Sequence, residues 1–325
     1  MDGNISILNK LVLNFYRGYL HFTLEENEIR LFDWALQEKF LEATVKSETF
    51  KRYPCSSEFC RLFFKKLISY LEPFDDIHDD IYSFLCTSMN YDKNNESFCY
   101  RHYIIDNNLN NIITMKETKN MVVNGTTGMK TWEASLMLAD FIISNKHLIE
   151  DKDILELGSG IGFAGITLSR YCFPRKVIMT DCHRDVLKGI CENIEINYPD
   201  TTPEINEPCT FYKSGQTNIG VMPLDWNNID ELPDNILPDV IIGADIVYDP
   251  SILDILCSTI KHFFKGNKSL NVYIASIIRN ENTFDGFLQA LKSYGMEYSE
   301  EPFENCVQLI WDSSVHRKIL RIYEK

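Results

Sequence analysis

Four acidic side chains stand where strands of the chain are expected to end. Glu156 lies two residues before a glycine loop, and Asp181, Asp225 and Asp245 each lie at or near the carboxyl end of a later apolar run. In an open parallel sheet, ligands bind outside the carboxyl ends of the strands, so we expect these acids to converge. Such a cluster suits a cationic ligand and disfavours a pyrophosphate. The competing interpretation is that each acid only caps the helix that follows it.

The glycine loop lies within residues 153–165. A short apolar run, Ile154 to Leu157, predicts a buried strand, and four glycines follow between positions 158 and 165 before apolar helical spacing resumes. Glycine lets the backbone turn sharply and approach a ligand where a Cβ would collide. Asp181 comes a little over twenty residues after the first of these glycines, the position from which a carboxylate reaches ribose hydroxyls. The pattern predicts a site for an adenosine-containing cofactor.

Two kinds of cofactor fit this unit. Residues 160–165 satisfy the dinucleotide fingerprint, which allows a nicotinamide or a flavin. S-adenosylmethionine has the same adenosine end but carries a sulfonium cation and no phosphate, so its pocket tolerates carboxylates. A hydride-transfer enzyme would also need a Tyr-x-x-x-Lys or comparable pair after the later strands, and the sequence holds none. The acids therefore favour S-adenosylmethionine, and a nicotinamide-dependent oxidoreductase is the alternative from another class.

The elements that would position these residues alternate between strands and helices. Apolar runs predict strands at 154–157, 177–180, 221–224, 240–244 and 272–277. This alternation predicts a parallel sheet with helices on both faces. Two closing strands are expected at 307–311 and 318–323, and residues 199–220, rich in Pro, Thr, Asn and Gly, are expected to form a surface loop.

The N-terminal part of the chain has a different pattern. Residues 5–90 are rich in aromatic residues at helical spacing, and the polar stretch 90–97 resembles a linker. We expect residues 1–97 to form a helical region that recognises the substrate, and residues 98–325 to form the catalytic domain. At the start of that domain, short strands near 112–115 and 121–123 are expected to pair as a hairpin around 116–120.

Three further phrases accompany the glycine loop. Gly125-Thr-Thr-Gly precedes a helix that Trp132 leads, Leu224-Asp-Trp226 ends one strand, and Asp245-Ile-Val-Tyr248 ends the next. In combination these phrases resemble the lysine methyltransferase group of the seven-strand class I methyltransferases, over almost the whole chain. Asn124 stands where that group has a tyrosine.

The resemblance implies an α/β fold, a Rossmann-like seven-strand methyltransferase sheet with a helical N-terminal region, and S-adenosylmethionine as cofactor. Asp245 would orient the incoming lysine ammonium and Tyr248 would wall its channel, so these two are the expected catalytic residues. Together with Glu156 from the acid cluster, the expected cofactor-binding residues are Trp132, Gly158, Ser159, Gly160, Asp181, Asp225, Trp226 and Ala244.

The same resemblance implies a partner. Within the group, the chain is similar to the enzymes that methylate a lysine of eukaryotic elongation factor 2, which makes that factor the expected protein substrate. A related methyltransferase with another protein target is the first alternative, because the catalytic motifs are shared. A binding protein that kept the cofactor fold but lost its activity is the second.

Composition limits the possible partners and location. The net charge of −15 argues against a nucleic-acid backbone as the main partner and suits a basic protein segment. Ten cysteines stand at irregular spacings without a Cys-x-x-Cys, and no apolar run is long enough to span a bilayer, so we expect reduced thiols and a cytoplasmic protein that binds no membrane. Cys182-His183 lacks a second paired cluster, so no metal site is expected.

Overall fold

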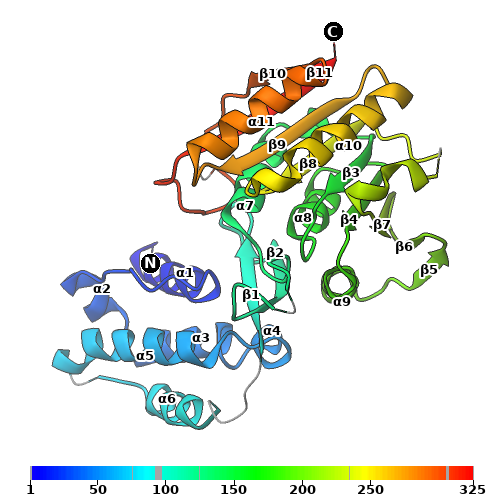
Figure 1. Ribbon diagram of the computed structural model, residues 1–325. Helices are drawn as coiled ribbons and strands as arrows, with labels where there is room; N and C mark the ends of the chain where they lie inside the picture. The colour runs from blue at the N-terminus through cyan, green and yellow to red at the C-terminus, as the bar shows by residue number, and fades with distance from the viewer. Residues whose placement is uncertain are drawn as a thin grey trace. The chain divides into compact units, whose positions relative to one another are not determined.

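The computed structural model describes residues 2–74, 76–91, 97–123, 125–233, 235–304 and 307–324 (Figure 1). It divides into two compact units, Met1–Asn120 and Met121–Lys325. Asn124, expected to replace a family tyrosine, and most of the expected linker at 90–97 lie outside the described residues. In the described part of the chain, no helix has both the length and the apolar character needed to cross a membrane.

The N-terminal unit packs its helices around aromatic side chains. Phe15 lies at the centre, with its ring centroid 5.3 Å from that of Phe63 and 6.2 Å from that of Phe40. Three helices begin at side-chain caps, where Asp33, Ser47 and Ser56 accept backbone N–H groups three residues later. The helices are α1 (Asp2–Tyr16), α2 (Glu26–Leu31), α3 (Trp34–Ala43), α4 (Glu48–Arg52), α5 (Ser57–Leu71), the 3-10 helix η1 (Glu72–Phe74) and α6 (Asp79–Tyr91).

A β-hairpin completes this unit and differs from the expected one. Strand β1 (Phe98–Ile104) pairs antiparallel with β2 (Ile112–Thr118), so the turn lies between them at 105–111. Met121–Val123 forms no strand and makes only an isolated bridge from Val123 to Thr126. Ile104 and Ile112 pack on the helical core, and the compact unit that contains them runs to Asn120.

The second unit is a nine-stranded sheet in the order β10-β11-β9-β8-β3-β4-β7-β6-β5. Strands β3, β4, β7, β8 and β9 run parallel, and β11 runs antiparallel to both β9 and β10. These seven strands form the Rossmann-like seven-strand sheet that the resemblance implied. The strands are β3 (Asp153–Leu157), β4 (Lys176–Asp181), β5 (Pro203–Asn206), β6 (Cys209–Ser214), β7 (Thr217–Pro223), β8 (Val240–Ala244), β9 (Asn271–Ile277), β10 (Met296–Glu300) and β11 (Arg317–Glu324).

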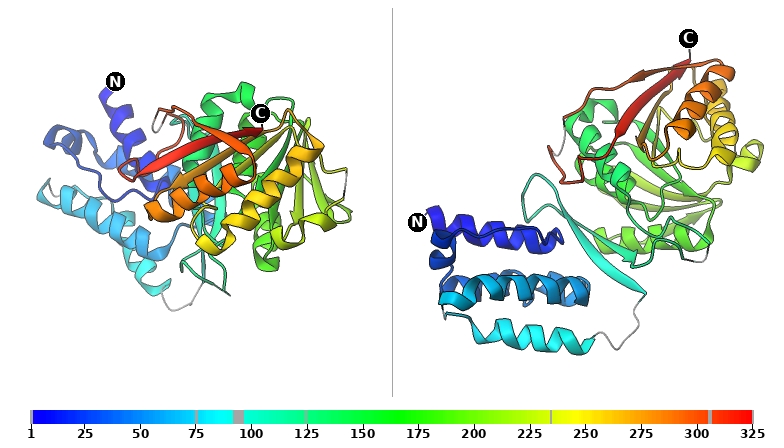
Figure 2. Two further views of the ribbon diagram at one scale, coloured as in Figure 1. Left: turned by 45° about the horizontal axis from the view of Figure 1, so that its top comes forward. Right: turned by 60° about the vertical axis from the view of Figure 1, so that its left-hand side comes forward.

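Helices cover both faces of this sheet (Figure 2). Leu155 and Leu157 of β3 face the cluster that includes Phe263 and Phe287 from the helices after β8 and β9. Glu156, between them, faces the helix after the glycine loop, because its carboxylate lies beside Gly165. The helices are α7 (Glu133–Ser144), η2 (Lys146–Leu148), α8 (Phe163–Tyr171), α9 (Arg184–Asn197), η3 (Trp226–Glu231), η4 (Pro250–Ile252), α10 (Leu253–Gly266) and α11 (Glu281–Ser293).

Two predictions about the edges of this sheet were wrong. The expected loop at 199–220 holds β5 and β6 and the start of β7, because Tyr212 and Ile219 are buried and pair across an antiparallel ladder. The expected strand at 307–311 is absent. Its backbone N–H groups donate to the carboxylate of Asp140, so they are not available for a neighbouring strand. In place of 307–311, β10 pairs antiparallel with the edge of β11 that does not face β9.

Candidate active site

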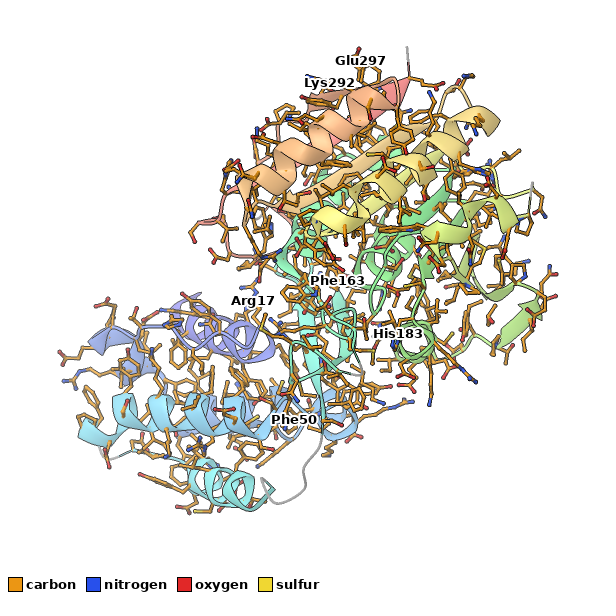
Figure 3. All side chains as sticks on the ribbon, in the orientation of Figure 1. Arg17, Phe50, Phe163, His183, Lys292 and Glu297 are labelled. Carbon is orange, nitrogen blue, oxygen red and sulfur yellow. The ribbon has the colours of Figure 1, made fainter. Side chains whose placement is uncertain are left out.

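A cavity of about 610 Å³ opens within the second unit, at the carboxyl ends of β3, β4, β7 and β8. This is the size range of ordinary cofactor and ligand pockets. Phe163 at the start of α8 and His183 before α9, both labelled in Figure 3, are among its lining residues. The structure brings all eleven sequence-predicted site residues into this lining, namely Trp132, Glu156, Gly158, Ser159, Gly160, Asp181, Asp225, Trp226, Ala244, Asp245 and Tyr248.

The glycine loop after β3 has a shape that other residues would not adopt. Gly158 and Gly160 have φ values of +59° and +52°, in the left-handed region that side chains disfavour. A Cβ on Gly158 would lie 2.8 Å from the Ile246 side chain, and one on Gly160 would lie 3.0 Å from the carbonyl oxygen of Gly128. The loop therefore presents bare backbone to the cavity.

Hydrogen bonds to β4 fix this loop. The Ser159 N–H donates to the Thr180 carbonyl at 2.8 Å, and the Thr180 N–H donates back to the Ser159 hydroxyl at 2.9 Å. The Thr180 hydroxyl donates to the Glu156 carbonyl at 2.6 Å. The Ser159 side chain thus holds the loop in position. Thr180 was not predicted, although its place just before Asp181 was a usable signal.

Glu156 is a buried acid with few partners. Its side chain is 1% exposed, and its Oε2 accepts the Gly165 N–H at 3.0 Å. Burial raises the pKa of this carboxyl to about 8, against the opposing effect of the hydrogen bonds from Gly165 and Ser159. A cation in the cavity would stabilise its ionised form.

Asp181 and Asp225 occupy the strand ends beyond the loop. The Asp181 carboxylate accepts the His183 N–H at 3.0 Å, and burial raises its pKa above the usual range. Asp225 caps η3 by accepting the Asn227 N–H at 2.9 Å, and the half-buried Trp226 follows it. The helix-cap interpretation therefore holds for Asp225, which lines the cavity as well.

Asp245 is held by an arginine and caps no helix. Its two carboxylate oxygens accept from Arg279 Nη1 at 2.9 Å and Nη2 at 2.7 Å. The cap of the next helix, η4, is Asp249, which accepts the Ser251 N–H at 2.9 Å. The helix-cap interpretation is therefore wrong for Asp245. The sequence analysis did not predict Arg279, although its position just past the end of β9 could have indicated it.

Two aromatic side chains complete the lining. Trp132 donates its indole N–H to the Thr127 carbonyl at 3.1 Å, and the Arg279 guanidinium lies 5.4 Å from a ring centroid of the same indole. Tyr248 is 57% exposed and hydrogen-bonds the Thr127 side chain, while partial burial raises the pKa of its hydroxyl. Thr127, in the loop before α7, thus contacts both rings.

The sequence of the chain matches a known family. The pattern of a lysine methyltransferase family matches residues 109–294. The mouse protein-lysine N-methyltransferase EEF2KMT is 30% identical over 93% of this chain and 90% of its own length. The human protein of that name is 28% identical over 83% of this chain and 81% of its own length.

A fungal relative and a solved structure are more limited matches. The protein-lysine N-methyltransferase EFM3 of Chaetomium thermophilum is 31% identical over 59% of this chain and 55% of its own length. The structure of Trm1 from Pyrococcus horikoshii with S-adenosyl-L-methionine covers 65% of this chain and 60% of that chain, at 10% identity and a TM-score of 0.43, too distant to carry an argument. On the family pattern and the mouse relative, this chain belongs to the lysine methyltransferase family.

Proposed function

We propose that the cavity binds S-adenosylmethionine and that the enzyme methylates a lysine of elongation factor 2 there. The observation that carries the proposal is the convergence of the glycine loop, four carboxylates and two tryptophans on one cavity. Family membership supplies the reaction class, protein-lysine N-methylation. It also sets aside the oxidoreductase alternative.

The residues present fit this cofactor. Gly158 and Gly160 leave bare backbone where a Cβ would crowd Ile246 or the Gly128 carbonyl, and Glu156 is a buried carboxyl without a cationic partner among the described residues. When bound, S-adenosylmethionine supplies a methyl group on a positively charged sulfur. Glu156 and its neighbouring carboxylates would stabilise that charge, whereas a dinucleotide would bring phosphates against them.

Each lining residue has a role in this proposal. The Gly158–Gly160 backbone would hold the methionine and ribose portion, and Asp181 would accept hydrogen bonds from the ribose hydroxyls. Trp226 and Asp225 would hold the adenine, Ala244 would line the cofactor side of the cavity, and Trp132 would hold the methionine side. These assignments rest on the family motifs together with the shared cavity.

Asp245 and Tyr248 would receive the substrate lysine. A lysine amine has an unperturbed pKa of about 10.4, so it must lose a proton before it attacks a methyl group. Aromatic walls and a nearby cation lower that pKa by desolvation and repulsion, so no strong base is needed. Asp245 would orient the amine, and Tyr248 would exclude water from one side of its channel.

Elongation factor 2 is the target because the mouse and human relatives carry it in their names and align along most of their length. The test is incubation of the purified enzyme with tritiated S-adenosylmethionine, first with elongation factor 2 and then with a cell lysate. Label on a lysine of elongation factor 2 is expected. Label on a different protein would contradict the target and support the related-methyltransferase alternative. No label in either experiment would support an inactive cofactor-fold protein.

We also propose a cytoplasmic location and a substrate-recognition role for the N-terminal helical region, 1–97. A second cavity of about 200 Å³ in the N-terminal unit is lined by Tyr16, Arg17 and Phe59 of this region and by Tyr100 and Arg101 of the neighbouring β1. Its aromatic walls offer a contact surface to a protein partner. Arg17→Gln should raise KM for elongation factor 2 and leave cofactor affinity unchanged, whereas an unchanged KM would count against the role. Imaging of the tagged protein tests the location.

A further inference from the structure

The ion pair between Asp245 and Arg279 joins the ends of two neighbouring strands. Asp245 follows β8 and Arg279 follows β9, and the arginine donates to both carboxylate oxygens. Such bidentate pairs fix a carboxylate in orientation as well as in position. The Asp245 side chain is only 8% exposed, whereas that of Arg279 is 49% exposed. The arginine therefore holds a nearly buried carboxylate from its solvent side.

The same guanidinium contacts a third element. It lies 5.4 Å from a ring centroid of Trp132, the residue just before α7, in the arrangement of a cation–π contact. The Trp132 indole N–H is already bound to the Thr127 carbonyl. Arg279 thus links the aromatic wall of the cavity to the carboxylate beside it.

We propose that Arg279 is a positioning residue of the methyl-transfer site. It holds the Asp245 carboxylate and the Trp132 indole, and it cancels the charge of Asp245 where the substrate lysine enters. This inference rests on the proposed function, in which Asp245 orients the lysine amine. A paired carboxylate still accepts hydrogen bonds through its free lone pairs. Its net field at the amine is small, because the guanidinium lies directly behind it.

The charge balance has a chemical consequence. A bare carboxylate beside the lysine would stabilise the ammonium form and so delay the loss of the proton. Pairing with Arg279 gives the amine an acceptor without that penalty. The other titratable groups that line the cavity are retained in an Arg279 variant, and they are Lys130, Glu156, Asp181, Cys182, His183, Asp225 and Tyr248.

The test compares Arg279→Gln and Arg279→Lys with a matched control. Arg175 also donates to carboxylates, to Asp153 at 2.7 Å and Asp239 at 3.1 Å. It lies just before β4, at the amino ends of the parallel strands and away from the cavity. Single-turnover methylation of elongation factor 2 is measured against pH at saturating S-adenosylmethionine. Arg279→Gln should move the pH–rate profile upward by about one unit, which is about a tenfold loss of rate near pH 7.

Arg279→Lys should keep the profile near that of the wild type, and Arg175→Gln should not move it. A profile that stays in place in Arg279→Gln would overturn the inference, because a purely structural loss lowers the rate without moving the profile. If the wild type does not methylate elongation factor 2, the proposed function has failed. The inference is then judged by unfolding Asp245→Asn, Arg279→Gln and the double variant, where additive losses of stability would refute it.

Discussion

At the scale of single residues, the site is defined by carboxylates in different surroundings. Glu156 is buried beside the glycine loop, Asp225 caps a helix at the rim, and Asp245 is paired with Arg279. One chemical group, the carboxyl, therefore has three different environments within one cavity. Of the three, Glu156 has its pKa raised, because burial disfavours the charged form of its carboxyl.

Glu156 makes the stability of the protein depend on pH. Its folded pKa of about 8 lies above the ordinary value of 4.5, so the folded state binds the proton more tightly than the unfolded state does. This contribution is fully present below about pH 4.5 and is lost as the pH rises to about 8, at up to about 1.4 kcal/mol per pH unit. Denaturant unfolding of the wild type and Glu156→Gln across this range measures it. A stability difference between the two that does not vary with pH would contradict the prediction.

Asp245 can be tested separately from Arg279. Asp245→Asn should lower the single-turnover rate about 100-fold, the effect of a misplaced reacting group, and leave the Kd for S-adenosylmethionine close to that of the wild type. The matched control is Asp249→Ala, which removes the cap of η4 and should cost about 1 kcal/mol of stability with turnover kept. Normal turnover in a folded, cofactor-binding Asp245→Asn variant would remove Asp245 from the catalytic assignment.

At the scale of elements, one buried carboxylate fixes the segment that precedes β11. Asp140 of α7 is 1% exposed and accepts the backbone N–H groups of residues 307, 308 and 309 and the indole N–H of Trp311. The donor–acceptor distances run from 2.6 to 3.2 Å. The loop between β10 and β11 is thus tied to the helix that begins at the cavity.

Removing that carboxylate should release the segment. Asp140→Ala leaves these four donors without their acceptor, and we expect a loss of about 3–5 kcal/mol of unfolding free energy. Glu133→Ala, which removes one exposed bond to the Asp312 N–H, should cost about 1 kcal/mol or less. Denaturant unfolding and hydrogen exchange at residues 307–309 measure the two effects. Equal losses in both variants would contradict the account.

The segment 307–309 shows how much of the structure can be predicted from the sequence and how much cannot. Buried runs such as 154–157 predicted the parallel strands, because a strand covered on both faces is apolar throughout. The glycine loop and strand-end acids predicted the cavity lining, because chain order fixes where carboxyl ends meet. The acceptor for the N–H groups of residues 307–309 is Asp140, up to 169 positions away, and no local sequence pattern predicts such a hydrogen bond. Arg279 stands just past a strand end, but the sequence does not show which acid it meets, because Asp245 lies 34 positions away.

At the scale of the whole molecule, the net charge of −15 should influence how the substrate arrives. An acidic enzyme attracts a basic protein segment from a distance, and salt screens that attraction. We expect kcat/KM for elongation factor 2 to fall as salt rises from about 0.1 M to 1 M, over which the Debye length drops from about 10 Å to 3 Å. The single-turnover rate of the preformed complex should change little. A kcat/KM that does not depend on salt would contradict a steering role for the charge.

The central claim is that the cavity at the carboxyl edge of the sheet holds S-adenosylmethionine, and titration calorimetry tests it most directly. The wild type should give binding heat with S-adenosylmethionine or its demethylated product and none with NAD. A folded Asp181→Ala variant should bind more weakly by about 1.5–3 kcal/mol, the value of a hydrogen bond to a charged group. Heat from NAD, with none from the methyl donor or its product, would contradict the account.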